Sequence, residues 1–91
     1  MTDEGRKNDT GKLRMELIPP EALEEIAKVL TYGATKYDSR NWEKGLAWSR
    51  VMGAALRHII AWNKGELTDP ETGLSHLSHA LCNLAFLATY E

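Results

Sequence analysis

The chain has one cysteine, three prolines and one phenylalanine among its 91 residues. The single cysteine, Cys82, excludes a disulfide within the chain and a zinc site built from several cysteines. No apolar run approaches the ~20 residues that a membrane-spanning helix needs. The polar first residues, MTDEGRK, lack the apolar stretch of a signal peptide. We therefore expect a cytoplasmic protein that does not associate with membranes.

An excess of charge of either sign is also missing. The chain has 11 Lys and Arg residues against 13 Asp and Glu residues, which gives a formal net charge of −2. Proteins that bind DNA or RNA polymers usually carry a broad basic face, so we expect no nucleic-acid polymer as a partner. A small phosphorylated ligand needs only a few local cations and is compatible with this composition.

Hydrophobic spacing predicts an all-α fold, a small bundle of three main helices over about residues 20–32, 48–64 and 73–89. The polar residues 1–11 are predicted to form a flexible tail, and residues 12–91 a single domain. Residues 12–18 are expected to be extended, because Ile18 precedes a proline. A long loop over about residues 33–47 separates the first two helices, and loops of that length are often functional.

The helices differ in how much apolar surface they carry. The first has one predicted core face, which consists of Leu23, Ile26, Ala27 and Leu30. The third is apolar on nearly all sides, and three short helices cannot enclose it. A chain of this length buries only about 60–65% of its unfolded surface. We therefore expect homo-oligomerisation to complete the bundle.

Three carboxylates, Glu21, Glu24 and Glu25, lie within one turn at the start of the first predicted helix. Carboxylates at this spacing can hold a divalent metal ion. They also suit the positive end of a helix dipole without any metal, and the sequence leaves both interpretations open.

Two histidines, His76 and His79, lie three residues apart on the third predicted helix. Such a pair can bind a metal or contact a phosphate, or it can consist of two hydrogen-bonded core residues. Asp69 and Glu71 lie in the turn before that helix, where they either complete a metal site or accept hydrogen bonds from the turn's own amides.

A set of cations and aromatic residues can form an anion site beside a stacking platform. Taken singly, each of the charged residues is by default a solvated surface group. The predicted nucleotide-binding residues are Lys12, Arg14, Tyr32, Lys36, Tyr37, Asn41, Trp42, Arg57, His58 and Glu71.

The ordered segments GKLRMELIPPEALEEIAKVLTYGATKY, NWEKG, ALRHIIAW and GELTDPETGLSHLSHAL together resemble the dATP/dGTP diphosphohydrolase N-terminal domain family of phages and bacteria. The resemblance covers about residues 9–88. This family is similar in fold to the MazG-like all-α pyrophosphohydrolases. These are metal-dependent dimers or tetramers that split a nucleoside triphosphate into a monophosphate and pyrophosphate.

The resemblance implies Mg²⁺ or Mn²⁺ as cofactor and residence in the host cytoplasm if a phage encodes the chain. The related enzymes hold their metal on an ExxE motif and a later ExxD motif. Glu21 to Glu24 matches the first, with Glu25 beside it, and these three are the expected catalytic residues. His76 and His79 stand at the second, which departs from the pattern because Mg²⁺ prefers carboxylates to imidazoles. The full predicted metal set is Glu21, Glu24, Glu25, Asp69, His76 and His79.

Two functions are compatible with these features. The first is metal-dependent hydrolysis of a purine deoxynucleoside triphosphate. The alternative is a sponge without catalytic activity that sequesters a nucleotide immune signal, of the cyclic oligonucleotide or cyclic ADP-ribose type, and so inhibits host anti-phage defence. Hydrolysis requires the α-helical carboxylates, whereas sequestration requires only the cations and aromatic residues.

Overall fold

The computed structural model describes residues 10–36, 40, 43, 45 and 47–91. They form a short 3-10 helix, η1 (Met15–Leu17), followed by α1 (Pro20–Gly33), α2 (Trp48–Asn63) and α3 (His76–Tyr90). Among the described residues there is no strand, only an isolated bridge between Thr68 and Ser75. The predicted all-α fold of three main helices is confirmed. Most of the predicted tail, and seven of the fifteen residues of the predicted long loop, lie outside the described residues.

The start of α1 follows from two adjacent prolines. Ile18 adopts an extended conformation, with a ψ of 126°, as expected for a residue before proline. Pro20 then occupies the first helical position, where its missing N–H leaves no hydrogen bond unmade. The prediction of an extended segment over residues 12–18 is wrong at η1, because proline restricts only the residue directly before it.

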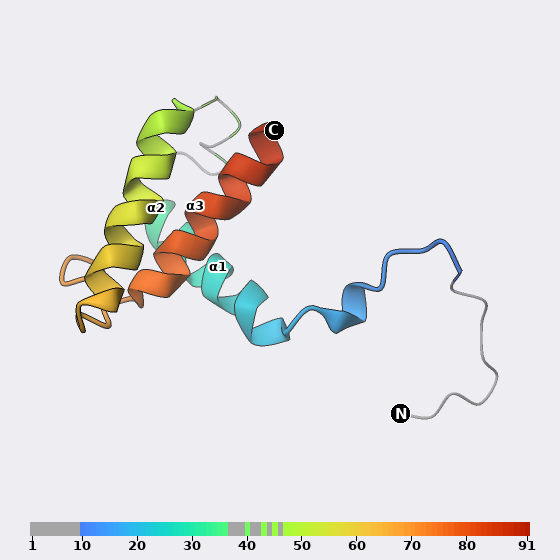
Figure 1. Cartoon of the computed structure of the whole chain (residues 1–91), viewed down its shortest axis with the longest axis horizontal. Helices are drawn as coiled ribbons and strands as arrows, with labels where there is room; N and C mark the ends of the chain where they lie inside the picture. The colour runs from blue at the N-terminus through green and yellow to red at the C-terminus, as the bar shows by residue number, and fades with distance from the viewer. Residues whose placement is uncertain (1–9, 37–39, 41–42, 44, 46) are drawn as a thin grey trace.

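The α2 and α3 helices pack side by side and form the centre of the molecule, and α1 crosses them at one end (Figure 1). The interface between α2 and α3 is built from small side chains. Val51 and Ala55 on α2, and Ala80 and Cys82 on α3, are at most 5% exposed. Small residues allow two helix backbones to approach closely, so the core lies along this seam.

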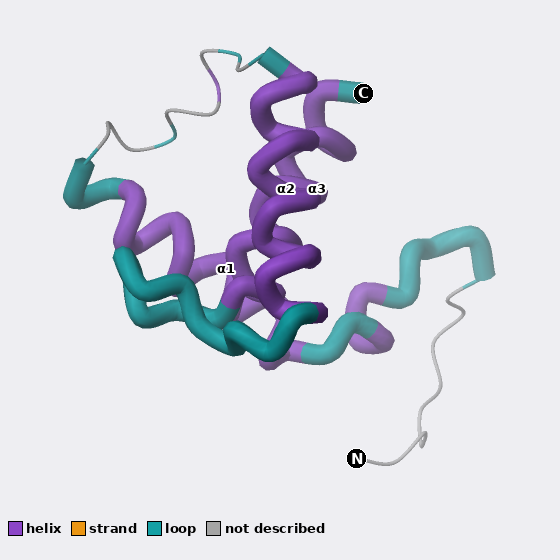
Figure 2. Tube along the Cα trace, turned by 60° about the vertical axis from the view of Figure 1, so that its left-hand side comes forward, coloured by secondary structure: helices purple, strands orange, loops and turns teal. Residues whose placement is uncertain are grey.

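The turn that connects α2 to α3, residues 64–75, lies at the end nearest α1, and Figure 2 shows it running alongside α1. α2 ends before Gly65, whose φ of 103° only glycine adopts at low cost. The predicted start of α3 at residue 73 is wrong by three residues. The amide of His76 donates to the carbonyl of Leu67, and the Ser75 side chain accepts from the Leu77 amide, so that the helix is capped at Ser75.

The predicted core face of α1 is also wrong in part. Leu23 and Leu30 are 54% and 39% exposed, Ala27 is exposed and Ile26 is half-buried. The side of α1 that meets α3 instead includes Glu25, which accepts a hydrogen bond from Ser78. Periodicity identified an apolar face, but that face is left open in the single chain. No helix within the described ranges is long and apolar enough to cross a membrane.

Candidate functional site

Three histidines meet between α2, α3 and the turn that connects them. The ring of His58, on α2, stacks on that of His79, with ring centroids 4.6 Å apart. On its other side, Nδ1 of His58 lies 2.8 Å from Nδ1 of His76. His76 is 5% exposed and its Nε2 is 2.7 Å from a carboxylate oxygen of Glu66. His76 is therefore a hydrogen-bonded core histidine, one of the two interpretations of the sequence.

Asp69 reaches the same cluster from the turn. Its Oδ1 accepts a hydrogen bond from the amide of Glu71 at 2.8 Å, and its Oδ2 lies 3.7 Å from Nε2 of His79. Of the two alternatives that the sequence left open for Asp69, the hydrogen bond to an amide of the turn is present. One oxygen stabilises the turn, and the other faces an imidazole.

Thr72 orients His79 from the turn. Its hydroxyl oxygen accepts from the amide of Leu74 and lies 2.8 Å from Nε2 of His79. Among the described residues, the donor atoms of His58, Asp69 and His79 lie within 4.8 Å of one another, and no other group of three such side chains is this close. The structure thus brings together Asp69 and His79 of the predicted metal set with His58, which was predicted to bind nucleotide.

The environment of the cluster disfavours the charged form of two of its imidazoles, those of His58 and His79. Burial lowers the pKa of His58, and the neighbouring His79 and His76 lower it further. Burial also lowers the pKa of His79, against the opposing effect of Asp69. Both rings are therefore neutral near pH 7, the form in which a histidine nitrogen has a lone pair to offer.

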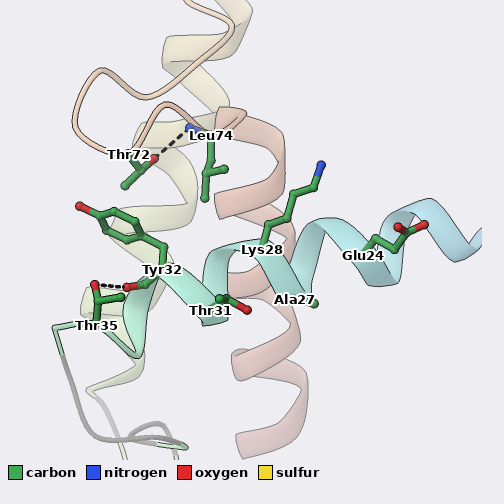
Figure 3. A pocket seen from close by; sticks show the side chains of 8 residues that line it. All are labelled: Glu24, Ala27, Lys28, Thr31, Tyr32, Thr35, Thr72 and Leu74. Carbon is green, nitrogen blue, oxygen red and sulfur yellow. Dashed lines mark hydrogen bonds between the residues drawn. The ribbon is translucent and has the colours of Figure 1, made fainter.

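An open hollow of about 530 Å³ lies beside the cluster, between α1 and the turn (Figure 3). Pockets for small ligands usually fall in the range of about 300–1,000 Å³. Figure 3 shows the ring of Tyr32 pointing towards Thr72, which borders the hollow and also contacts His79. The hollow is lined by Glu24, Ala27, Lys28, Thr31, Tyr32, Thr35, Thr72 and Leu74.

Charged side chains lie at the edge of the hollow. The Lys36 ammonium forms an ion pair with Glu71 and lies 5.7 Å from the centre of the Tyr32 ring. Lys36, Glu71 and Tyr32 were all predicted to bind nucleotide, and the structure places them together. The turn after α2 and the end of α1, far apart in sequence, thus form one edge of the hollow.

The three carboxylates of α1 do not converge on one point. Glu25 is occupied on both oxygens, by Ser78 at 2.7 Å and by Lys28 at 2.6 Å. The hydrogen bonds from Lys28, and secondarily from Ser78, lower the pKa of Glu25. Glu24 lines the hollow, and Glu21 is exposed outside it.

Three of the remaining predicted ligand contacts, Lys12, Arg14 and Arg57, are not among the residues that line the hollow. Lys12 and Arg14 lie on the N-terminal segment, which runs away from the helices (Figure 1), and Arg14 pairs with Glu16. Arg57 is exposed on α2, with its guanidinium over Gly53. Three further predicted residues, Tyr37, Asn41 and Trp42, lie outside the described residues.

Sequence reasoning missed the polar partners Glu66, Thr72 and Ser78. No periodic signal marks them, since two lie in the turn and the third is a small polar residue on an otherwise apolar helix. The one available signal was general: buried imidazoles and carboxylates require hydrogen-bond partners.

The family described as dATP/dGTP diphosphohydrolase, N-terminal, matches residues 2–91. A curated relative named dATP/dGTP diphosphohydrolase, from Salmonella phage PMBT28, is 42% identical over 83 residues. The match covers 91% of this chain and 28% of the relative, so the chain spans less than a third of that protein's length. No solved structure matches the chain.

Proposed function

The chain belongs to the dATP/dGTP diphosphohydrolase N-terminal family, and on this premise we propose that it binds a purine deoxynucleoside triphosphate and hydrolyses it to the monophosphate and pyrophosphate. The observation that carries the proposal is the family match along residues 2–91, in a chain whose helix α1 borders a hollow of nucleotide-binding size.

The hollow offers the contacts that a nucleotide needs. Tyr32 provides an aromatic face on which a base can stack. Lys28 and Lys36 carry positive charge on the same stretch of α1 and its extension, where phosphate oxygens can pair with them. Thr31 and Thr72 contribute hydroxyl groups to the lining. We assign the base to the Tyr32 end, where Lys36 also lies, and the phosphates to Lys28.

Glu24 is the acidic side chain of the hollow. Among the residues that the structure describes, it makes no hydrogen bond or ion pair, and its carboxylate is exposed. A carboxylate beside bound phosphates can accept the proton of an attacking water. We assign this role to Glu24, with Glu25 in a positioning role because its oxygens hold Lys28 and Ser78.

The family resemblance implies Mg²⁺ or Mn²⁺, but the α1 carboxylates do not fit such an ion by themselves. Glu25 is already bound on both oxygens, and no third described donor joins Glu21 and Glu24. The proposed proton transfer to Glu24 therefore requires no metal ion held on α1.

The oligomer is part of the proposal. The outer face of α2 carries large apolar side chains at 37–67% exposure, on one side of the helix. Exposed apolar patches of this kind mark association sites, and we assign this one to a second copy of the chain. The face consists of Trp48, Met52, Leu56, Ile59 and Ile60.

Light scattering coupled to size-exclusion chromatography tests the oligomer. The account expects a dimer or tetramer that Leu56→Asp dissociates. Leu13→Asp is the matched control, because Leu13 is 87% exposed on the N-terminal segment and far from this face. A monomeric wild-type chain contradicts this part of the proposal.

Product analysis tests the hydrolysis. Purified chain is incubated with dATP, dGTP or dTTP, together with Mg²⁺, Mn²⁺ or EDTA, and the mixture is separated by chromatography. The account expects monophosphate and pyrophosphate in equal amounts from the purine substrates. A nucleotide that is depleted from solution and returns intact after heat denaturation indicates sequestration instead and contradicts hydrolysis. The comparisons give that alternative no support.

Two variants localise the activity. Tyr32→Ala is expected to raise KM, and Glu24→Gln to lower kcat by roughly a hundredfold or more. Glu91→Gln, which neutralises an exposed carboxylate at the end of α3, is the matched control and should retain full activity. Equal activity in Glu24→Gln and in the control would remove Glu24 from the reaction.

A further inference from the structure

We propose that His58, Asp69 and His79 bind one divalent transition-metal ion between α2, α3 and the turn that joins them. One ligand comes from each of these three segments. The site is independent of the proposed hydrolysis, because metal binding can be measured without any nucleotide.

The separations between the ligand atoms suit a single ion. All three lie within 4.8 Å of one another, and Nε2 of His79 is 3.7 Å from Oδ2 of Asp69. Nitrogen and oxygen ligands at about 2.0–2.2 Å from a metal lie roughly 3–4.4 Å apart. The rings of His58 and His79 now stack with their planes 10° apart, so both imidazoles must rotate about their side-chain bonds until their lone pairs converge on the ion.

A hydrogen-bond chain orients His58 for this role. Glu66 accepts from Nε2–H of His76, since a carboxylate only accepts. In its neutral form His76 then presents a lone pair at Nδ1, and this lone pair accepts Nδ1–H from His58. This hydrogen-bond chain leaves the Nε2 lone pair of His58 free to bind a metal. Metal-binding histidines commonly donate their second nitrogen to such a partner.

The other two ligands are also held in place. The amide of Glu71 fixes Oδ1 of Asp69 and leaves Oδ2 facing His79. The Thr72 hydroxyl accepts from the Leu74 amide and lies 2.8 Å from Nε2 of His79. In the His79 tautomer that carries its proton on Nδ1, the Nε2 lone pair accepts from Thr72, and an ion would replace the Thr72 proton there.

The donor set selects the kind of metal. Two imidazoles and one carboxylate suit Mn²⁺, Fe²⁺, Co²⁺ and Zn²⁺ better than Mg²⁺ or Ca²⁺, which prefer oxygen ligands. The side chains of His79 and Asp69 are 12% and 17% exposed, so the site is sheltered but open to an ion. Three protein ligands leave further coordination positions for water or a ligand.

Titration of EDTA-treated, tag-free chain with Co²⁺ tests the site. The visible absorption bands of bound Co²⁺ report its coordination, and calorimetry gives the stoichiometry. We expect one Co²⁺ per chain, displaced by Zn²⁺, with Mg²⁺ unable to compete at equal concentration. Absence of Co²⁺ binding would overturn the proposal.

The variants separate loss of a ligand from loss of the fold. Asp69→Asn keeps the oxygen that accepts from Glu71 and removes the charge, so the turn persists while Co²⁺ affinity falls by more than about tenfold. His79→Ala is expected to abolish binding. Cys82→Ala is the control, because it removes the chain's one thiol and should leave binding unchanged. Unchanged Co²⁺ affinity in a folded Asp69→Asn protein would also overturn the proposal.

Discussion

The histidine cluster and the carboxylates of α1 both consist of residues that can bind metals, but the two regions differ in burial and in hydrogen bonding. The cluster lies between two packed helices and a tight turn, and each imidazole has a named partner at 2.7–2.8 Å. On α1, Glu21 and Glu24 are exposed, and Glu25 is used to attach the helix to Ser78.

This difference shows which region of a single chain can gather metal-binding side chains without a partner. Between α2 and α3, helix packing brings together side chains from distant parts of the sequence. The carboxylates of α1 come from one helical turn and have no facing element that supplies further ligands among the described residues. The single chain therefore brings the ligand atoms of the cluster together, whereas it leaves the α1 carboxylates apart.

The largest expected effect on stability is that of His76→Ala. His76 is 5% exposed and hydrogen-bonded to both Glu66 and His58. Its removal therefore leaves the Nδ1–H of His58 without this hydrogen-bond partner. The free energy of unfolding should fall by about 1–3 kcal/mol, measured by urea denaturation in EDTA. Glu21→Gln on α1 is the control and should change it by no more than about 0.5 kcal/mol. Equal losses of unfolding free energy in the two variants would contradict the claim that the cluster contributes more to stability than the α1 carboxylates do.

A smaller effect is expected where the two regions meet. Ser78 is 4% exposed on α3 and donates to Glu25 on α1. Ser78→Ala removes this attachment and should lower Tm by a few degrees in a calorimetric scan. Glu25→Gln should cost less, because the amide oxygen still accepts from the serine. A larger loss for Glu25→Gln than for Ser78→Ala would show that the Lys28 pair, and not the attachment, holds α1.

The ion pair at the edge of the hollow should matter for binding more than for folding. Lys36 and Glu71 keep side-chain exposures of 45% and 64%, and exposed pairs contribute less than about 1 kcal/mol. Lys36→Ala is thus expected to leave the unfolding midpoint nearly unchanged and to weaken dGTP binding, measured by equilibrium dialysis. Unaltered dGTP affinity would remove Lys36 from the ligand contacts.

The smallest effect is predicted for the thiol. Cys82 is 2% exposed, and burial raises its pKa to about 11. At pH 8 its reactive thiolate is then roughly a thousandfold less abundant than the thiol. Native protein should react with a thiol reagent only as fast as it unfolds, while protein in urea reacts at once. Rapid labelling of the native chain would show that the seam between α2 and α3 opens.

Sequence reasoning found the helices because each has a clear apolar period, and it found their ends where proline or glycine fixes the backbone, as at Pro20 and Gly65. It misplaced the start of α3, since the cap at Ser75 depends on turn hydrogen bonds that periodicity does not encode. It also assigned Leu23 and Leu30 to the core, because a period identifies an apolar face without identifying what covers it.

The candidate site was predicted only in pieces. Asp69 and His79 were placed in one metal set because they adjoin the same turn, but His58 was assigned to the nucleotide. Its approach to them depends on how α2 packs against α3, which no local pattern records. The grouping of Tyr32, Lys36 and Glu71 likewise required the turn to lie beside α1.

The proposed nucleotide site is the hollow between α1 and the turn that joins α2 to α3. Titration of ¹⁵N-labelled chain with dGTP, followed by amide chemical shifts, tests it most directly. We expect the largest changes in residues 31–35 and 72–74, which border the hollow from its two sides. Saturating dGTP that leaves both segments unchanged, or shifts only the outer face of α2, would contradict it.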